Sequence, residues 1–215
     1  MKFHWNTIGA QSHPSGDPLS LERELGICLV AEKYGFDSVQ LPLSDDAPDP
    51  LLLSLTLSRR TQKLRFMVSC RPDRISPAYF VQQINTLSSL IDGRVHVRIV
   101  SESADAAHER SIEFVSVCQA FWSRSGPVNH SGTHYRVAEG KIKTPFVSSV
   151  RQTPEIFLDG DLLRLPFENS AEAILAHAAS GVREFVIEGR GAKELEHFGR
   201  KVLPLVRHTE LQPCD

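Results

Sequence analysis

The sequence predicts an α/β protein built from repeated strand–helix units around a parallel β-sheet. Short apolar runs alternate along the chain with longer segments of helical periodicity, at the spacing of βαβ units. The hydrophobic fraction of 41% and the charged fraction of 23% are ordinary for a globular protein. A length of 215 residues supports one sizeable hydrophobic core, so we expect residues 1–215 to form a single domain.

The first part of the chain contains two such units. Residues 1–7 alternate and carry aromatic side chains, which predicts a strand. A loop rich in Gly, Ser and Pro then leads to a helix over residues 20–34, which Gly35 ends. The next strand covers residues 37–42, and an acidic loop separates it from an apolar helix over residues 51–58.

Two further units follow. The third strand covers residues 64–69, and the helix with the clearest periodicity covers residues 76–91, where Asp92-Gly93 ends it. The fourth strand covers residues 95–100 and precedes a helix over residues 108–123. Because parallel sheets place ligand sites at the carboxyl ends of their strands, we expect functional residues in the loops that follow these strands.

The remaining segments predict two more core strands. These lie over residues 155–158 and 184–187, with helices over residues 171–180 and 192–207. A closed (β/α)₈ barrel needs eight strands, and we count six core strands in addition to a hairpin. The sheet is therefore either open or a barrel that lacks some of its units.

The hairpin covers residues 128–137, with Ser131-Gly132 as its expected turn. Its His130 and His134 have a spacing that also suits a metal site. In a two-residue hairpin His130 would lie across from Thr133, so the two imidazoles would not converge. We therefore favour a polar hairpin over a metal site. His96, within a strand, is interpreted as a core histidine with its polar atoms satisfied.

Composition excludes several classes of function. A net charge of −2 offers no strong field for nucleic acid or an anionic membrane, and the longest apolar stretch, around residues 50–57, is too short to span a bilayer. No targeting segment is visible. The four cysteines are scattered without a CxxC pair, which argues against zinc or a disulfide framework and fits a reducing compartment. We expect a cytoplasmic protein without a metal centre.

Four stretches of the sequence resemble one known family. They carry the signatures Arg71-Pro72, Ser76-Pro77 and Asp92-Gly93-Arg94, and they cover residues 31–43, 64–103, 131–137 with 153–161, and 181–207. In order and spacing they are similar to the bacterial luciferase-like, flavin-dependent monooxygenases, nearest the alkanesulfonate monooxygenase branch. The resemblance implies a TIM-barrel-like (β/α) barrel that is incomplete, with about six core parallel strands plus a β-hairpin insertion. The sixth and seventh β/α units are missing near residues 161–170, where residues 161–169 form a bridge.

The resemblance also implies a site for reduced FMN at the carboxyl ends of the strands. The positions that match its ring contacts are Thr7, Ser69, Cys70 and Ser101. The family motif on the phosphate side is replaced, and Arg110, one turn further along, is the candidate for that role.

This sequence departs from the family pattern at several strand ends. Ile8 replaces a histidine of the branch, and Ala47 replaces its cysteine. Arg98 and Glu102 stand where the family carries Asn and Gly. The catalytic His and Arg of the branch fall in the missing units, so the sequence names no catalytic residue.

These observations leave open which function the chain has. The first hypothesis is an FMN-dependent monooxygenase that takes reduced flavin from a separate reductase and acts on a small organic molecule, with organosulfur compounds among the candidates. The alternative is a non-catalytic flavin- or ligand-binding homologue, or the partner subunit of a full-length paralogue. A third idea, a metal-dependent hydrolase using Asp45, Asp46 and Asp49, is weaker than a solvated loop in which Asp49 caps the next helix.

The helix over residues 51–58 is apolar on more than one face, so it needs cover on two sides. The resemblance places the family's dimer interface on the second and third helices. Together these points predict a homodimer through residues 51–58 and 76–91.

Overall fold

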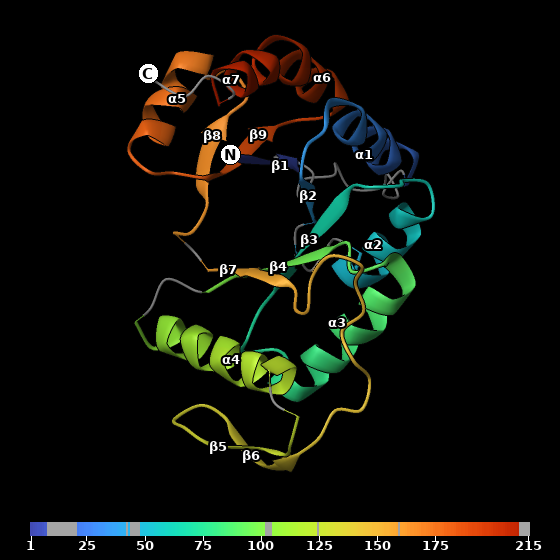
Figure 1. Ribbon diagram of the computed structural model, residues 1–215, viewed down its shortest axis with the longest axis vertical. Coiled ribbons are helices and arrows are strands. Elements are labelled where there is room, and N and C mark those ends of the chain that lie inside the picture. The colour runs from blue at the N-terminus through green and yellow to red at the C-terminus, as the bar shows by residue number, and fades with distance from the viewer. Residues whose placement is uncertain are drawn as a thin grey trace, which may run out of the picture. The chain divides into compact units, whose positions relative to one another are not determined.

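The computed structural model describes residues 1–7, 21–41, 43, 48–101, 105–123, 125–158 and 160–210 (Figure 1). By their internal contacts the residues group into two compact units, Met1–Phe66 with Gly160–Asp215 and Met67–Asp159. Five residues named above lie outside the described residues: Ile8, Asp45, Asp46, Ala47 and Glu102. Ser20, the first residue of the predicted helix over residues 20–34, also lies outside them.

The strands follow the order β7-β4-β3-β2-β1-β9-β8, and strand β3 (Arg65–Cys70) contains the boundary between the two units. The registered pairs of this sheet run parallel. The predicted fold class, an incomplete TIM-barrel-like α/β fold, is confirmed. The sheet has seven strands rather than six, because Leu163–Pro166 forms strand β8 within the segment that was predicted to be only a bridge.

The first unit carries four complete strands of this sheet. They are β1 (Lys2–Thr7), β2 (Ser38–Leu41), β8 and β9 (Glu184–Gly189), and its helices are α1 (Leu21–Tyr34), α2 (Pro50–Ser58), α5 (Ala171–Ala179), α6 (Ala192–Lys201) and α7 (Leu203–Glu210). One face of the strands packs on an aromatic cluster, in which the ring of Phe3 lies 5.4 Å from Phe185 and 6.3 Å from Phe198. Side chains alternate along a strand, so the residues between these aromatics face the opposite side.

The last predicted helix, residues 192–207, is two helices in the structure. Helix α6 ends at Lys201 and α7 begins at Leu203. Pro204 lies in the first turn of α7, where its missing N–H costs nothing, whereas it would break the interior of one continuous helix.

The second unit contains the rest of β3, strands β4 (Val95–Ile99) and β7 (Glu155–Phe157), and a two-stranded antiparallel hairpin. The hairpin strands are β5 (Val128–Ser131) and β6 (Arg136–Gly140), and the helices are α3 (Pro77–Ile91) and α4 (Asp105–Ser123). Its core includes Phe80 and Phe114, whose ring centroids are 5.4 Å apart. The polar Asn85 is buried but satisfied, because it accepts from Trp122 Nε1 at 2.7 Å and donates to the carbonyl of Thr144 at 2.6 Å.

Helix α3 begins and ends as its sequence predicts. The Ser76 hydroxyl caps it, and Asp92 leaves the helix in the left-handed conformation with φ of 52°. Gly93 follows with φ of +64°, and a Cβ built on it would overlap the side chain of Ser148. Glycine is therefore required here both for its backbone conformation and for the close approach of another segment.

The hairpin register differs from the prediction. Ser131 pairs with Arg136 and His130 pairs with Val137, so the connection is the four residues 132–135 and not the dipeptide Ser131-Gly132. His130 therefore lies across from Val137, whereas Thr133 was expected. Separately, none of the helices in the described part of the chain is long and apolar enough to cross a bilayer.

Candidate functional site

In the second unit the ends of β3 and β4 are held together by backbone pairing. The Val100 amide donates to the Cys70 carbonyl at 2.8 Å, which brings the predicted site residues Ser69 and Cys70 beside Ser101. Ser69 is 5% exposed, and its Oγ has no hydrogen-bond partner among the described residues. A buried hydroxyl without a partner is uncommon in proteins and is a reason to look for a ligand at that point.

Cys70 lies next to this hydroxyl in sequence but has a different environment. Burial, together with the Asp73 carboxylate, raises the pKa of its thiol to about 12. The Cys118 thiol of α4, whose own pKa is raised mainly by burial and further by Cys70, is a near neighbour. A protonated thiol is a poor nucleophile, so Cys70 supplies a small apolar surface rather than covalent chemistry.

Arg110 lies in the second turn of α4 and is half-buried. Within the described residues its side chain has no hydrogen bond or ion pair. Burial raises the pKa of the Tyr135 phenol to about 12, and the positive charge of the nearby Arg110 guanidinium partly opposes this rise. The Tyr135 hydroxyl donates to the Pro72 carbonyl at 2.7 Å. Arg110 is thus an available cation near the start of a helix, where anions are favoured.

Thr7, the remaining predicted cofactor contact, belongs to the first unit. It ends strand β1 and is paired with Gly189 of β9. Its Oγ1 is buried and, like Ser69 Oγ, has no hydrogen-bond partner in the described part of the chain.

Also in the first unit, a row of polar side chains crosses three strands near their carboxyl ends. Asn6 of β1 is in register with Gln40 of β2 on one side and with Glu188 of β9 on the other. The Asn6 Nδ2 donates to Glu188 Oε1 at 3.1 Å. Asn6 is 9% exposed and Gln40 is 4% exposed, so this row lies inside the unit rather than on its rim.

Strand β8 adds a cation to this row. Arg164 pairs through Nη1 with Glu188 Oε1 and donates from Nη2 to Gln40 Oε1 at 2.9 Å. Its guanidinium therefore connects β9 to β2. Asn6, Gln40, Arg164 and Glu188 are called the polar row below.

Two residues before Asn6 on β1, the same face carries a histidine. His4 is fully buried, with Nδ1 2.8 Å from Ser38 Oγ and Nε2 2.8 Å from Glu184 Oε2. Burial raises the pKa of Glu184, but hydrogen bonds from His4 and Lys2 outweigh it and lower that pKa below its ordinary value. This arrangement is fully paired and fixes the strands.

In the second unit His96 is equally buried. Its Nδ1 lies 3.0 Å from Glu155 Oε2 across the β4–β7 pair, and its ring packs on Phe157. Its burial in the core agrees with the prediction, whereas the 3.0 Å contact with Glu155 does not show that its ring nitrogens are satisfied by hydrogen bonds. Arg98 lies two residues further along β4, so it is on the same face as His96.

Of the two metal alternatives, the one that uses Asp45, Asp46 and Asp49 is described only at Asp49, because Asp45 and Asp46 lie outside the described residues. Asp49 caps α2, accepting from the amides of Leu51 at 2.9 Å and Leu52 at 3.1 Å, as the solvated-loop interpretation predicts. His130 Nε2 contacts Glu113 at 2.9 Å. No group of three or more potential ligands could hold a metal in this part of the chain.

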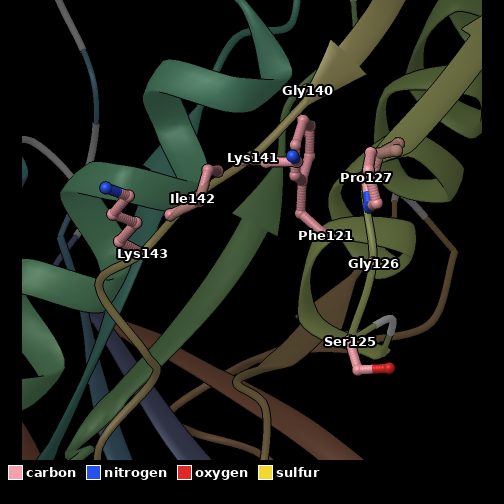
Figure 2. Close-up of a pocket in the computed structure, with 9 residues that line it drawn as sticks. Phe121, Ser125, Gly126, Pro127, Gly140, Lys141, Ile142 and Lys143 are labelled. Atoms are coloured by element: carbon pink, nitrogen blue, oxygen red, sulfur yellow. The ribbon is translucent and has the colours of Figure 1, made fainter.

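A surface hollow of about 360 Å³ lies where α4 meets the hairpin. Figure 2 shows the Phe121 ring between Lys141 and Pro127, while Ser125 and Lys143 point away from it. Its polar side chains are exposed, so none is fixed in position for a ligand. The hollow does not qualify as the functional site.

Sequence reasoning missed the polar row. Its members are separated by up to 182 positions (Asn6 to Glu188) and form no local motif. The alternation of β1 and β9 could have indicated Asn6 and Glu188 as residues of one face. Arg164 gave no such signal, because its strand has only four residues.

Solved structures with the same fold come from several oxygenases. EDTA monooxygenase from Chelativorans sp. BNC1 superposes with a TM-score of 0.66 at 17% identity, covering 98% of this chain and 66% of that one. A long-chain alkane monooxygenase gives 0.63 at 17% identity, with 88% and 64% covered. The oxygenating constituent of 3,6-diketocamphane monooxygenase from Pseudomonas putida, solved in complex with FMN, gives 0.61 at 16% identity, with 94% and 64% covered.

At these identities the likeness concerns the fold, and the chain spans less than two thirds of each of these relatives. The family itself is established by sequence. The model of the luciferase-like monooxygenases matches residues 1–158, which is well over half of the chain. The chain therefore belongs to the luciferase-like monooxygenase family.

Proposed function

We propose that this chain binds reduced FMN at its strand ends and acts as a flavin-dependent monooxygenase on a small organic substrate. The observation that carries the proposal is the buried Ser69 hydroxyl, which has no partner among the described residues and lies at the end of β3 beside β4. Family membership supplies the reaction class.

The residues at the ends of β3 and β4 fit a flavin in chemical terms. Ser69 offers a hydroxyl, and Cys70 offers a neutral thiol of small volume. Their burial suits an apolar ring that must be shielded from water. Arg110, with the positive end of α4, suits a phosphate.

Each residue would have a limited and separate role. Ser69 Oγ would donate to a ring heteroatom, and Cys70 would pack against the ring. Arg110 would bind the phosphate oxygens. Bound reduced FMN would supply the electrons that activate O₂, while the protein holds the ring in place and excludes water.

We propose a small organic molecule as the substrate, with organosulfur compounds as the first class to test because of the sequence resemblance to the alkanesulfonate branch. Reduced flavin would come from a separate reductase, as the resemblance to the flavin-dependent monooxygenases implies.

The cofactor can be tested by comparing FMN with riboflavin, which lacks the phosphate. FMN is reduced anaerobically and titrated into the chain while flavin fluorescence is followed. Arg110→Gln should weaken FMN binding about tenfold and leave riboflavin binding unchanged. Arg136→Gln, on the exposed face of the hairpin, is the matched control.

Turnover is then measured separately, by mixing the reduced complex with O₂ and a set of alkyl sulfonates and sulfides. Oxygenated product would support the monooxygenase. Binding of FMN without product from any substrate would favour the alternative of a flavin-binding homologue. If reduced FMN does not bind, the proposal is wrong.

We also propose that the chain forms a homodimer through α2 and α3. Leu52 on α2 is 68% exposed, and Tyr79 and Leu90 on α3 are each 56% exposed. Large apolar side chains exposed to this extent on two helices suit an interface. Sedimentation should give a dimer that Leu52→Asp or Leu90→Asp dissociates. A monomeric wild-type chain would contradict the proposal.

A further inference from the structure

The polar row of the first unit has hydrogen-bonding capacity that the described residues leave unused. Asn6 uses only its Nδ2, as a donor to Glu188, and Gln40 uses only its Oε1, as an acceptor from Arg164. Within the described residues, Asn6 Oδ1 therefore remains as an acceptor and Gln40 Nε2 as a donor. Both residues are at most 9% exposed, and buried amides normally use both ends.

The two unused groups are held in fixed orientations. Asn6 and Gln40 are direct cross-strand neighbours, so their side chains leave the sheet on one face in adjacent positions. The Glu188 carboxylate fixes one amide from one side, and the Arg164 guanidinium fixes the other. A donor and an acceptor are thus presented side by side near the carboxyl ends of parallel strands, where ligands of such sheets bind.

The charge of the row restricts the ligand. Arg164 and Glu188 neutralise each other, so the row carries no net charge. An anion would gain little from a guanidinium that is already paired, and it would be repelled by the adjacent carboxylate. A cation would gain little from the Glu188 carboxylate, which is already paired, and it would be repelled by the adjacent Arg164 guanidinium. A neutral group that offers one donor and one acceptor has neither problem.

From this geometry we propose that Asn6 and Gln40, oriented by Arg164 and Glu188, bind the edge of a neutral amide or imide. The ligand N–H would donate to Asn6 Oδ1, and the ligand C=O would accept from Gln40 Nε2. Such an edge occurs in the pyrimidine ring of a flavin and in a carboxamide substrate. The first source rests on the function proposed above, and the second does not.

The experiment observes the side-chain amides directly. The ¹H–¹⁵N signals of the Asn6 and Gln40 NH₂ groups are followed by NMR in the full chain, and Gln40→Glu assigns the Gln40 signal by removing it. Riboflavin, 3-methylriboflavin and benzamide are titrated in turn. Methylation at N3 removes the imide donor, so it tests the contact to Asn6 without altering the protein.

If the ligand is a flavin, riboflavin should shift both signals, and 3-methylriboflavin should bind about tenfold more weakly. Gln40→Glu, which replaces the amide donor by an acceptor, should weaken riboflavin to a similar degree. Gln152→Glu makes the same change at an exposed position and should have no effect. If the ligand is a carboxamide substrate, benzamide shifts the signals and riboflavin does not.

The proposal is overturned if no probe shifts the two amide signals, or if benzamide does not shift them and riboflavin binds with equal affinity after N3 methylation and in Gln40→Glu. The two proposals can fail separately. Flavin binding that ignores N3 methylation would preserve the proposed function and remove this inference. A response to benzamide alone would preserve this inference and remove the flavin from this row.

Discussion

Replacing Glu113 by Gln should loosen the hairpin from helix α4. The Glu113 carboxylate accepts three hydrogen bonds of 2.9 Å, from His130 Nε2 and from the backbone amides of His134 and Tyr135. Burial raises the pKa of Glu113, but these three bonds outweigh it and lower that pKa to about 2. The carboxylate is thus the main polar link between this part of the hairpin and the helix.

The expected cost follows from the geometry. A Gln side chain keeps one carbonyl oxygen, so at least one of the three donors would face an NH₂ group and lose its partner. The other two bonds would weaken because their acceptor is no longer charged. Hydrogen bonds to charged groups contribute about 1.5–3 kcal/mol, so the loss should be about 2–3 kcal/mol.

Hydrogen exchange at the His134 and Tyr135 amides measures this loss locally. Both amides should exchange faster in Glu113→Gln, by a factor that corresponds to the lost free energy. Glu109→Gln removes the same charge one turn earlier on α4, at an exposed position, and should leave both rates unchanged. Equal exchange in the wild type and Glu113→Gln would refute the reasoning.

Further predictions concern pH, one turn and one thiol. The pKa of Glu113 in the folded chain lies below its ordinary value of 4.5, so the Glu113 carboxylate stabilises the fold fully above pH 4.5. This stabilisation should be lost as the pH falls toward about 2. Urea unfolding at a series of pH values should show the loss in the wild type and not in Glu113→Gln. Gly93→Ala should destabilise the fold by about 1–3 kcal/mol in urea unfolding, whereas Gly126→Ala, with open space around it, should change little. Cys28, Cys70 and Cys118 are buried, and the fourth cysteine, Cys214, lies outside the described residues, so it is replaced by Ser for this test. In the Cys214→Ser chain, Cys70 should resist thiol reagents at neutral pH until denaturant is added, since its pKa is about 12. Rapid labelling of the folded chain would contradict this.

Much of the fold could be predicted from the sequence, because long elements carry their own signals. Helix α3 has clear apolar periodicity, a serine cap and an Asp-Gly stop, and its bounds were found to within a residue. Strand β8 has only four residues and ends at Pro166, so it offers no comparable pattern. Its pairing with β9 is a tertiary property.

The candidate site could be predicted only in part for the same reason. The resemblance indicated Ser69 and Cys70, and in the structure they lie beside Ser101. The polar row depends on the register of β8, β9, β1 and β2, which no local pattern encodes. The hairpin was placed correctly, but its turn was not. Ser131-Gly132 has the composition of a two-residue turn, whereas the connection covers residues 132–135.

The position of the unit boundary within β3 has a consequence for biosynthesis. The first unit is discontinuous: Lys2 of β1 pairs with Glu184 of β9, 182 residues later, whereas residues 67–159 form a continuous unit. Strand β1 is made about 180 residues before β9, so it must wait for one of its two neighbours while the residues between them are synthesised. Residues 67–159 can therefore fold before the first unit is complete, and until β9 has been made the edge of β1 is exposed to unwanted strand pairing.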